Sequence, residues 1–425
     1  MAKNPWLALV VLGLAGLASQ SASASTFKVL YSPCAQPGCA DGRSLAAGLL
    51  RDPSGTLYGV AAEGGANNGG TVFALTPNGD DWQFQVLYSF CAQADCADGQ
   101  SPRAELIEDA QGNLYGTTSS GSTQAGTVFK LTHDAARTNW TYNVIHTFCP
   151  VAGCADGQTP NSRLTYLGAA SGAPYDGVSQ LYGTTQTGGS TQGGVVYQLT
   201  PKRDGSWRYV TVYELCQGQA CRTGYTPARG LIMDRTGNLF LNAQNGGDAG
   251  VGTLIELVHH HGRFWKPTQL YSFCAVTGCT DGSGPSGALA FDAAGNLFGT
   301  TAGGGTQSSG TLFEISPAGS TWNEQVLYNF CSKNRCKDGT PPVGVASDAA
   351  GGLIGAAAFG GRGQGSGTLF RFDAGAFQLV YQFCHDRHCS DGIAPESPPL
   401  ADGAGNFFGT TYEGGTGGVI YEITP

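Results

Sequence analysis

The chain has 425 residues, of which 31 are acidic and 22 are basic, so its net charge at pH 7 is −9. This acidic balance argues against binding to nucleic acid or to an anionic membrane surface. Glycine is frequent (67 residues), charged residues make up only 12%, and the 14 cysteines are an even number. Such a composition is typical of an exported protein rich in β-strands.

The first 24 residues have the pattern of a secretory signal peptide. Lys3 supplies a basic start, the apolar stretch Trp6–Ala18 is too short to span a bilayer, and Ala22–Ala24 has the small-x-small form of a cleavage site. We expect cleavage after Ala24 and a secreted or periplasmic protein. The alternative is a retained membrane anchor, although no later apolar run reaches transmembrane length.

A strand is predicted at Phe27–Tyr31, directly before the first of seven cysteine pairs. Four residues separate the cysteines of every pair, and the pairs recur at intervals of 53 to 67 residues. This regular spacing in an exported chain indicates seven disulfides. Zinc is the alternative, but six of the seven loops offer no further soft ligand at a fixed spacing. The expected bonds join Cys34 to Cys39, Cys91 to Cys96, Cys149 to Cys154, Cys216 to Cys221, Cys274 to Cys279, Cys331 to Cys336 and Cys384 to Cys389.

Each interval between cysteine pairs predicts four short strands, A to D in chain order. In the second unit they are Arg103–Asp109, Asn113–Ser119, Gly126–Thr132 and Trp140–Phe148, and they are rich in β-branched and aromatic residues. The Asp and Gly residues of Asp109–Asn113 suit a tight turn between A and B. No segment after the signal peptide has a convincing helical period.

Four strands per unit predict an all-β fold, a seven-bladed β-propeller with four-stranded antiparallel blades, which occupies residues 25–425 as one domain. The chain begins with a lone D-type strand, Phe27–Tyr31, and finishes with a C-type strand, Gly418–Thr424. The N-terminal strand can therefore complete the last blade and close the ring, which removes exposed strand edges. An open solenoid is the alternative.

The recurring pattern DGxxP…L…D…GNLYGTT…GG…GTVFKLTP…VLYSF resembles the GloVer tandem repeat of exported bacterial proteins called choice-of-anchor tandem repeat GloVer-containing proteins. The resemblance covers Phe27 to Pro425. It implies an exported repeat protein of propeller type, and it implies no particular activity because the function of the family is not established. The chain departs from the family pattern in two respects. The family name implies a sorting anchor, which we do not find at this C-terminus. The cysteine pairs resemble a disulfide-bearing variant of the loop that precedes Asp-Gly in the family.

Six of the seven disulfide loops continue into an Asp-Gly pair, and the fourth has Thr223-Gly224 instead. Because antiparallel strands alternate in direction, these D–A loops share one face with the glycine-rich B–C loops. We favour a structural role, in which each carboxylate caps backbone N–H groups of the turn. The alternative is a ring of carboxylates that holds calcium, and otherwise we expect no cofactor. The residues are Asp41, Asp98, Asp156, Asp281, Asp338 and Asp391.

Two further features concern the opposite face, which carries the tight turns. The third unit has an insertion, Gly168–Val178, between strands A and B. Five tryptophans share one register at the start of strand D, and we expect them to pack a blade against its neighbour rather than stack on sugars. They are Trp82, Trp140, Trp207, Trp265 and Trp322.

The sixth and seventh disulfide loops are basic, whereas the first two contain no basic residue. On an acidic protein this basic sector would attract an anionic ligand, such as an acidic polysaccharide. The alternatives are incidental charge on solvated loops, and zinc at the two histidines if the neighbouring cysteines were reduced. The basic sector comprises Lys333, Arg335, Lys337, His385, Arg387 and His388.

Three functions fit these observations. We favour a non-enzymatic exported binding or surface module, a monomer that recognises carbohydrate or another anionic ligand. The second is a propeller hydrolase or lyase that acts on a polysaccharide or a small ester through carboxylates or calcium. Its candidate carboxylates are Asp98, Asp156, Glu396 and Glu413. The third is a purely structural envelope protein; no catalytic motif decides among the three.

Overall fold

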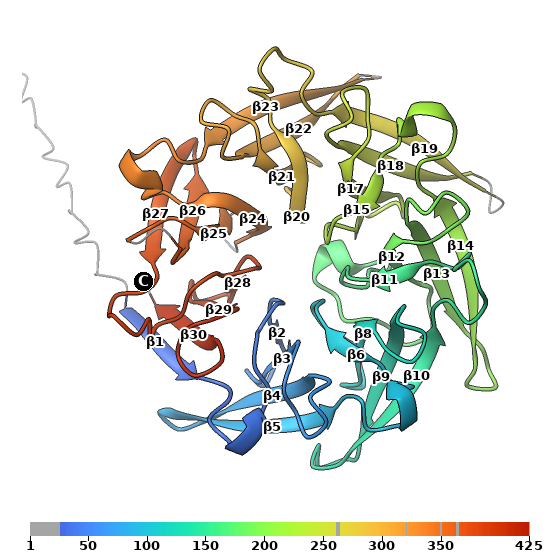
Figure 1. Cartoon of the computed structure of the whole chain (residues 1–425), viewed down its shortest axis with the longest axis vertical. Coiled ribbons are helices and arrows are strands. Elements are labelled where there is room, and N and C mark those ends of the chain that lie inside the picture. The colour runs from blue at the N-terminus through green and yellow to red at the C-terminus, as the bar shows by residue number, and fades with distance from the viewer. Residues whose placement is uncertain (1–25, 261–263, 320, 349–350, 363–364, 425) are drawn as a thin grey trace, which may run out of the picture.

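The chain folds into four-stranded antiparallel units arranged around a common centre (Figure 1). The computed structural model describes residues 26–260, 264–319, 321–348, 351–362 and 365–424. The expected signal peptide lies outside these ranges. The prediction of an all-β chain built from this repeated unit is confirmed. None of the helical turns in the described part of the chain is long and apolar enough to cross a bilayer.

The first four units follow the chain in order, and each is numbered here by its place in the sequence. Unit 1 contains β2 (Leu50–Arg51), β3 (Leu57–Ala61), β4 (Thr71–Asn78) and β5 (Asp81–Ser89). Unit 2 contains β6 (Gln100–Pro102), β7 (Ile107–Glu108), β8 (Leu114–Ser120), β9 (Thr127–His133) and β10 (Trp140–Thr147). Unit 3 contains β11 (Gln158–Pro160), β12 (Leu181–Thr187), β13 (Val195–Pro201) and β14 (Trp207–Glu214). Unit 4 contains β15 (Tyr225–Pro227), β16 (Ile232–Met233), β17 (Leu239–Asn245), β18 (Thr253–His260) and β19 (Phe264–Ser272).

Units 5 and 6 are joined into one eight-stranded sheet by a single parallel bridge between Ala288 and Gly344. Unit 5 contains β20 (Ser283–Phe291), β21 (Leu297–Gly303), β22 (Thr311–Ala318) and β23 (Thr321–Asn329). Unit 6 contains β24 (Thr340–Ser347), β25 (Leu353–Phe359), β26 (Thr368–Asp373) and β27 (Ala376–Gln382). Unit 7 combines β28 (Leu400–Ala401), β29 (Phe407–Thr411) and β30 (Val419–Thr424) with β1 (Thr26–Tyr31), which pairs antiparallel with β30.

Seven disulfides close the loops between successive units, each within one predicted cysteine pair. The bonds join Cys34 to Cys39, Cys91 to Cys96, Cys149 to Cys154, Cys216 to Cys221, Cys274 to Cys279, Cys331 to Cys336 and Cys384 to Cys389. All fourteen cysteines are therefore oxidised, and zinc ligation by these thiols, the alternative weighed from the sequence, does not apply to this state of the protein.

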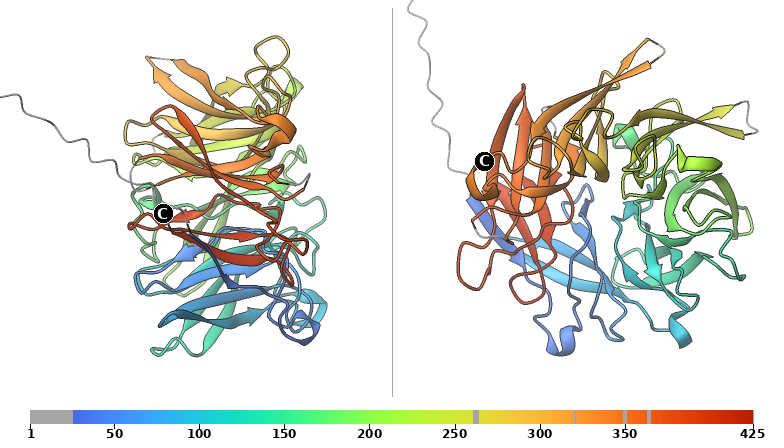
Figure 2. Two further views of the ribbon diagram at one scale, coloured as in Figure 1. Left: turned by 90° about the vertical axis from the view of Figure 1, so that its left-hand side faces the viewer. Right: turned by 45° about the horizontal axis from the view of Figure 1, so that its top comes forward.

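The seven disulfide loops are not identical in their backbone. Four of them contain a short 3₁₀ turn: η1 (Pro37–Cys39), η2 (Ala94–Cys96), η4 (Gln219–Cys221) and η5 (Asn334–Cys336). The other three loops differ, because the chain reaches Cys154, Cys279 and Cys389 through hydrogen-bonded turns instead. A further 3₁₀ turn, η3 (Ala169–Ser171), belongs to the insertion of unit 3. In the side view the units stand beside one another, and loops project from both faces (Figure 2).

The apolar core lies between neighbouring units rather than within them. Units 1 and 2 share one cluster that includes Val72 and Phe129, and units 4 and 5 share another that includes Leu254 and Phe313. Each of the five tryptophans packs edge-to-face on an aromatic ring of the preceding unit, at centroid distances of 5.7 to 6.3 Å. This geometry agrees with a packing role for the tryptophans.

A glycine in the second strand of most units makes room for an aromatic ring of the third strand. In unit 2, a Cβ on Gly116 would lie 2.6 Å from the Phe129 ring. Unit 4 has Leu241 at this position, and its partner across the ladder is the smaller Ile255. Because Ile255 does not reach across as the ring does, the Leu241 side chain can occupy this place, and unit 4 lacks the glycine of the repeat pattern.

The innermost strands differ from the prediction. Arg103–Asp109 is not one continuous strand, because residues 103–106 leave the ladder between β6 and β7. Pro102 faces Thr118 and Ile107 faces Tyr115, so the inner strand carries two extra residues over this span. This is a β-bulge, which redirects side chains and is common beside binding sites.

Candidate functional site

The predicted Asp-Gly carboxylates are internal supports of the disulfide loops. Asp98 is fully buried and accepts hydrogen bonds from the Tyr88 hydroxyl at 2.8 Å and from the backbone N–H groups of Ala92 and Gln93 at 2.9 and 3.1 Å. Burial, the hydrogen bond to Asp98 and the charge of Asp98 together raise the pKa of the Tyr88 hydroxyl. The same tyrosine–aspartate bond recurs at 2.8 Å for Asp41, Asp281, Asp338 and Asp391.

The remaining units vary this contact. In unit 2, His146 replaces the tyrosine, and its Nε2 lies 2.9 Å from Asp156. In unit 3, the Tyr213 hydroxyl donates a hydrogen bond to the hydroxyl of Thr223 at 2.9 Å. Because the carboxylates are engaged by their own loops, they do not converge. Among the described residues, no group of three or more His, Cys, Asp or Glu side chains is placed to hold a metal ion.

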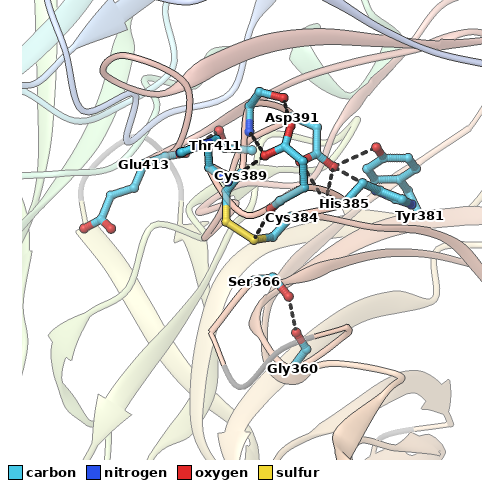
Figure 3. The surroundings of a disulfide bond; sticks show 12 residues. Gly360, Ser366, Tyr381, Cys384, His385, Cys389, Asp391, Thr411 and Glu413 are labelled. Carbon is cyan, nitrogen blue, oxygen red and sulfur yellow. Dashed lines mark hydrogen bonds and ion pairs between the residues drawn. A yellow bond between two sulfur atoms is a disulfide. The ribbon is translucent and has the colours of Figure 1, made fainter.

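The predicted basic sector lies on exposed disulfide loops. Lys333, Arg335, Lys337, Arg387 and His388 are exposed, and the Lys333 ammonium lies 5.8 Å from the centre of the Phe377 ring. His385 is engaged by its own loop, since its Nδ1 lies 2.9 Å from Asp391 (Figure 3). The figure also shows the disulfide between Cys384 and Cys389 that closes this loop. The structure therefore shows a charged loop surface here.

The structure brings other charged residues together at the common centre of the units. A cavity of about 100 Å³ is lined by the first-strand segments of all seven units. We call it the axial cavity. Its charged lining consists of Arg103, Glu105, Arg163, Arg229 and Glu396.

Two of the three arginines are neutralised within the axial cavity. Arg163 lies 3.6 Å from Glu105, and Arg229 lies 3.3 Å from Glu396. Arg229 also donates to the carbonyl oxygen of Ala46 at 2.7 Å, so this side chain of unit 4 spans the centre and reaches units 1 and 7. No carboxylate of the described residues lies within ion-pair distance (4 Å) of Arg103. One guanidinium is therefore available to an external anion.

Two buried polar atoms of the cavity also lack a hydrogen-bond partner among the described residues. They are Oδ1 of Asn161 and Oγ of Ser397, and both side chains are only 7% exposed. Buried polar groups are normally satisfied, so unpaired ones beside a cavity call for a polar ligand or water. Asn161 and Ser397 thus add two polar side chains to the wall of the cavity that Arg103 also lines.

Of the carboxylates considered for catalysis, only Glu396 reaches the axial cavity. Asp98 and Asp156 are engaged by Tyr88 and His146 at their own disulfide loops. The Glu413 side chain is directed away from Asp391 (Figure 3). Sequence reasoning missed Arg103, Glu105, Arg163 and Arg229. One signal was present in the sequence. A proline recurs in the first strand of most units, and the three residues that follow it differ from unit to unit. Residues at these three positions line the cavity.

The comparisons with known proteins concern the repeat and the fold. The Gloeobacter/Verrucomicrobia repeat model matches residues 16–177, 168–336 and 268–425. No curated protein matches the chain. Among solved structures, a putative 6-phosphogluconolactonase from Bacteroides uniformis is similar over 84% of this chain and 88% of its own, with a TM-score of 0.52 and 13% identity. A PQQ-bound aldose sugar dehydrogenase from Streptomyces coelicolor is similar over 84% and 97%, with a TM-score of 0.44 and 15% identity. At such identity the likeness concerns a propeller-like fold alone.

Proposed function

This chain belongs to the Gloeobacter/Verrucomicrobia repeat family, and we propose that it is an exported, non-enzymatic binding module whose axial cavity takes a small organic anion. The observation that carries the proposal concerns Arg103. Of the three arginines that line the axial cavity, Arg103 is the one that has no carboxylate partner among the described residues. A guanidinium binds carboxylate or phosphate through paired hydrogen bonds. Asn161 and Ser397 would hold a polar substituent of the same ligand.

We further propose a closed seven-bladed propeller of residues 25–425 as the scaffold, formed after removal of residues 1–24. The pairing of β1 with β30 supports closure, and so does the apolar cluster in which Phe408 and Ile420 of unit 7 pack near Leu57 and Phe73 of unit 1. Seven disulfides support a secreted or periplasmic location, where thiols remain oxidised. We expect a monomer that needs neither calcium nor another cofactor to bind.

The test is isothermal titration of the oxidised protein with acetate, butyrate, glucuronate and phosphate, beside neutral propanol and glucose. We expect anions to bind and Arg103→Gln to weaken binding about 10- to 100-fold, as the loss of a charged hydrogen bond predicts. Arg335→Gln, on an exposed loop, is the matched control and should bind like the wild type. A chelator should change nothing.

The outcomes separate this proposal from its alternatives. Anion binding that disappears when Lys333, Arg335, Lys337 and Arg387 are all changed to alanine, and survives Arg103→Gln, would place the site on the basic sector instead. Turnover of a sugar or ester that depends on Glu396 would favour the hydrolase or lyase. Absence of any binding to these probes would overturn the proposal in favour of a structural role.

A further inference from the structure

The axial cavity continues into a larger and mainly apolar space. A second cavity, of about 440 Å³, shares Glu105, Arg163 and Leu289 with the axial cavity. We call it the vestibule. It lies at the ends of the innermost strands next to the A–B turns, since its lining includes both residues of β2 and one of β28.

The lining of the vestibule is apolar over most of its extent. The apolar side chains that keep some exposure there are Leu50, Ile232, Phe291 and Leu400. Among the residues that line it, charge is confined to Arg51 and to the two residues shared with the axial cavity, Glu105 and Arg163. These side chains would release water to an apolar group that packs against them.

The insertion of unit 3 forms part of this wall and breaks its symmetry. Ala169 and Ala170 of η3 line the vestibule, although they belong to a segment that the other units lack. The segment is anchored away from the opening by Tyr175, which is buried and whose backbone exchanges hydrogen bonds with Glu108 and Ala110 of unit 2. The small side chains of η3 thus narrow the vestibule without filling it.

We infer that the ligand is an amphipathic carboxylate, with its anionic group at Arg103 and an alkyl or aryl group in the vestibule. This inference rests on the proposed function, because it assumes that the axial cavity binds an anion. The continuity of the two cavities carries the argument. A charged constriction that opens into an apolar space matches a molecule with one charged end and one apolar end.

The experiment is a titration series with straight-chain carboxylates from acetate to octanoate at pH 7. Each methylene that enters the vestibule should tighten binding about fourfold, the value expected for burial of one CH₂ group. Arg103→Gln should weaken every member of the series by the same factor. Ala170→Glu, an exposed substitution in η3, should flatten the dependence on chain length and leave acetate unaffected. Ser171→Glu adds the same charge to the same turn outside the vestibule lining and should retain the wild-type series.

Each result decides a separate point. Binding that depends on Arg103 but is equal for acetate and octanoate overturns the apolar tail and leaves the proposed function intact. Octanoate binding that survives Arg103→Gln overturns the position of the anionic group. Failure of every carboxylate to bind overturns the proposed function itself.

Discussion

Glu324 predicts an unusual dependence of stability on pH. In units 1, 2, 3, 6 and 7 the equivalent residue of the outer strand is aromatic and stacks on a ring of the preceding unit, as Tyr142 does on Tyr88 at 4.1 Å. Unit 5 instead places a carboxylate there, opposite Ile315 in the ladder. Its Oε1 is buried and has no hydrogen-bond partner among the described residues.

Burial, with a smaller contribution from the negative charge of Asp281, raises the pKa of Glu324 from 4.5 to about 7. The folded state therefore holds its proton more tightly than the unfolded chain does. The stabilising contribution of the protonated form is complete below about pH 4.5 and is lost as the pH rises through 7. A difference of this size corresponds to about 3 kcal/mol for full burial, and solvent screening of this half-exposed side chain reduces the expected effect to about 1–2 kcal/mol.

The perturbation is Glu324→Gln, which removes the titration and keeps the shape of the side chain. We expect equal stability of variant and wild type at pH 4, and a variant that is more stable by about 1–2 kcal/mol at pH 8. The assay is chemical denaturation at both values of pH, with the disulfides intact. Glu413→Gln, a position outside the core, is the control and should follow the wild type. A Glu324→Gln variant with the same pH profile as the wild type would refute the reasoning.

Two further predictions concern the repeated contacts. Asp98→Asn should lower stability by about 1–3 kcal/mol, because it weakens a buried site that satisfies the Tyr88 hydroxyl and two backbone N–H groups; denaturation at pH 7 measures it, and an unchanged midpoint would contradict the structural role. Gly116→Ala should cost about 1–3 kcal/mol by overpacking against Phe129, whereas Gly403→Ala, with no atom within 4 Å of the new methyl group, should be tolerated.

The repeated unit was predictable because its determinants are local. Strand composition, Asp-Gly turns and cysteine spacing recur along the chain. The strand order predicted for one interval, such as residues 91–149, therefore applies to the other intervals. The family resemblance drawn from the same pattern is confirmed by the repeat model. The aromatic packing of the tryptophans also followed from their shared register.

The axial cavity was not predictable in the same way. Arg103, Arg163 and Arg229 lie at different positions after the recurring proline, and no local pattern joins them. Their proximity arises because bulged inner strands of different units meet at the centre. The salt bridge between Arg229 and Glu396 links residues 167 positions apart, a contact that depends on the placement of unit 4 opposite unit 7.

The pairing of β1 with β30 has a consequence for how the chain folds. Thr26 and Thr424, partners in this ladder, are separated by 398 residues, so it is among the most non-local contacts in the molecule. Loop-closure entropy opposes such a contact until the intervening units have condensed, which raises the contact order and delays the final step. Because synthesis starts at the N-terminus, β1 cannot pair until β30 has been made. Until the two strands pair, each exposes an unpaired edge to chaperones, proteases or a second chain.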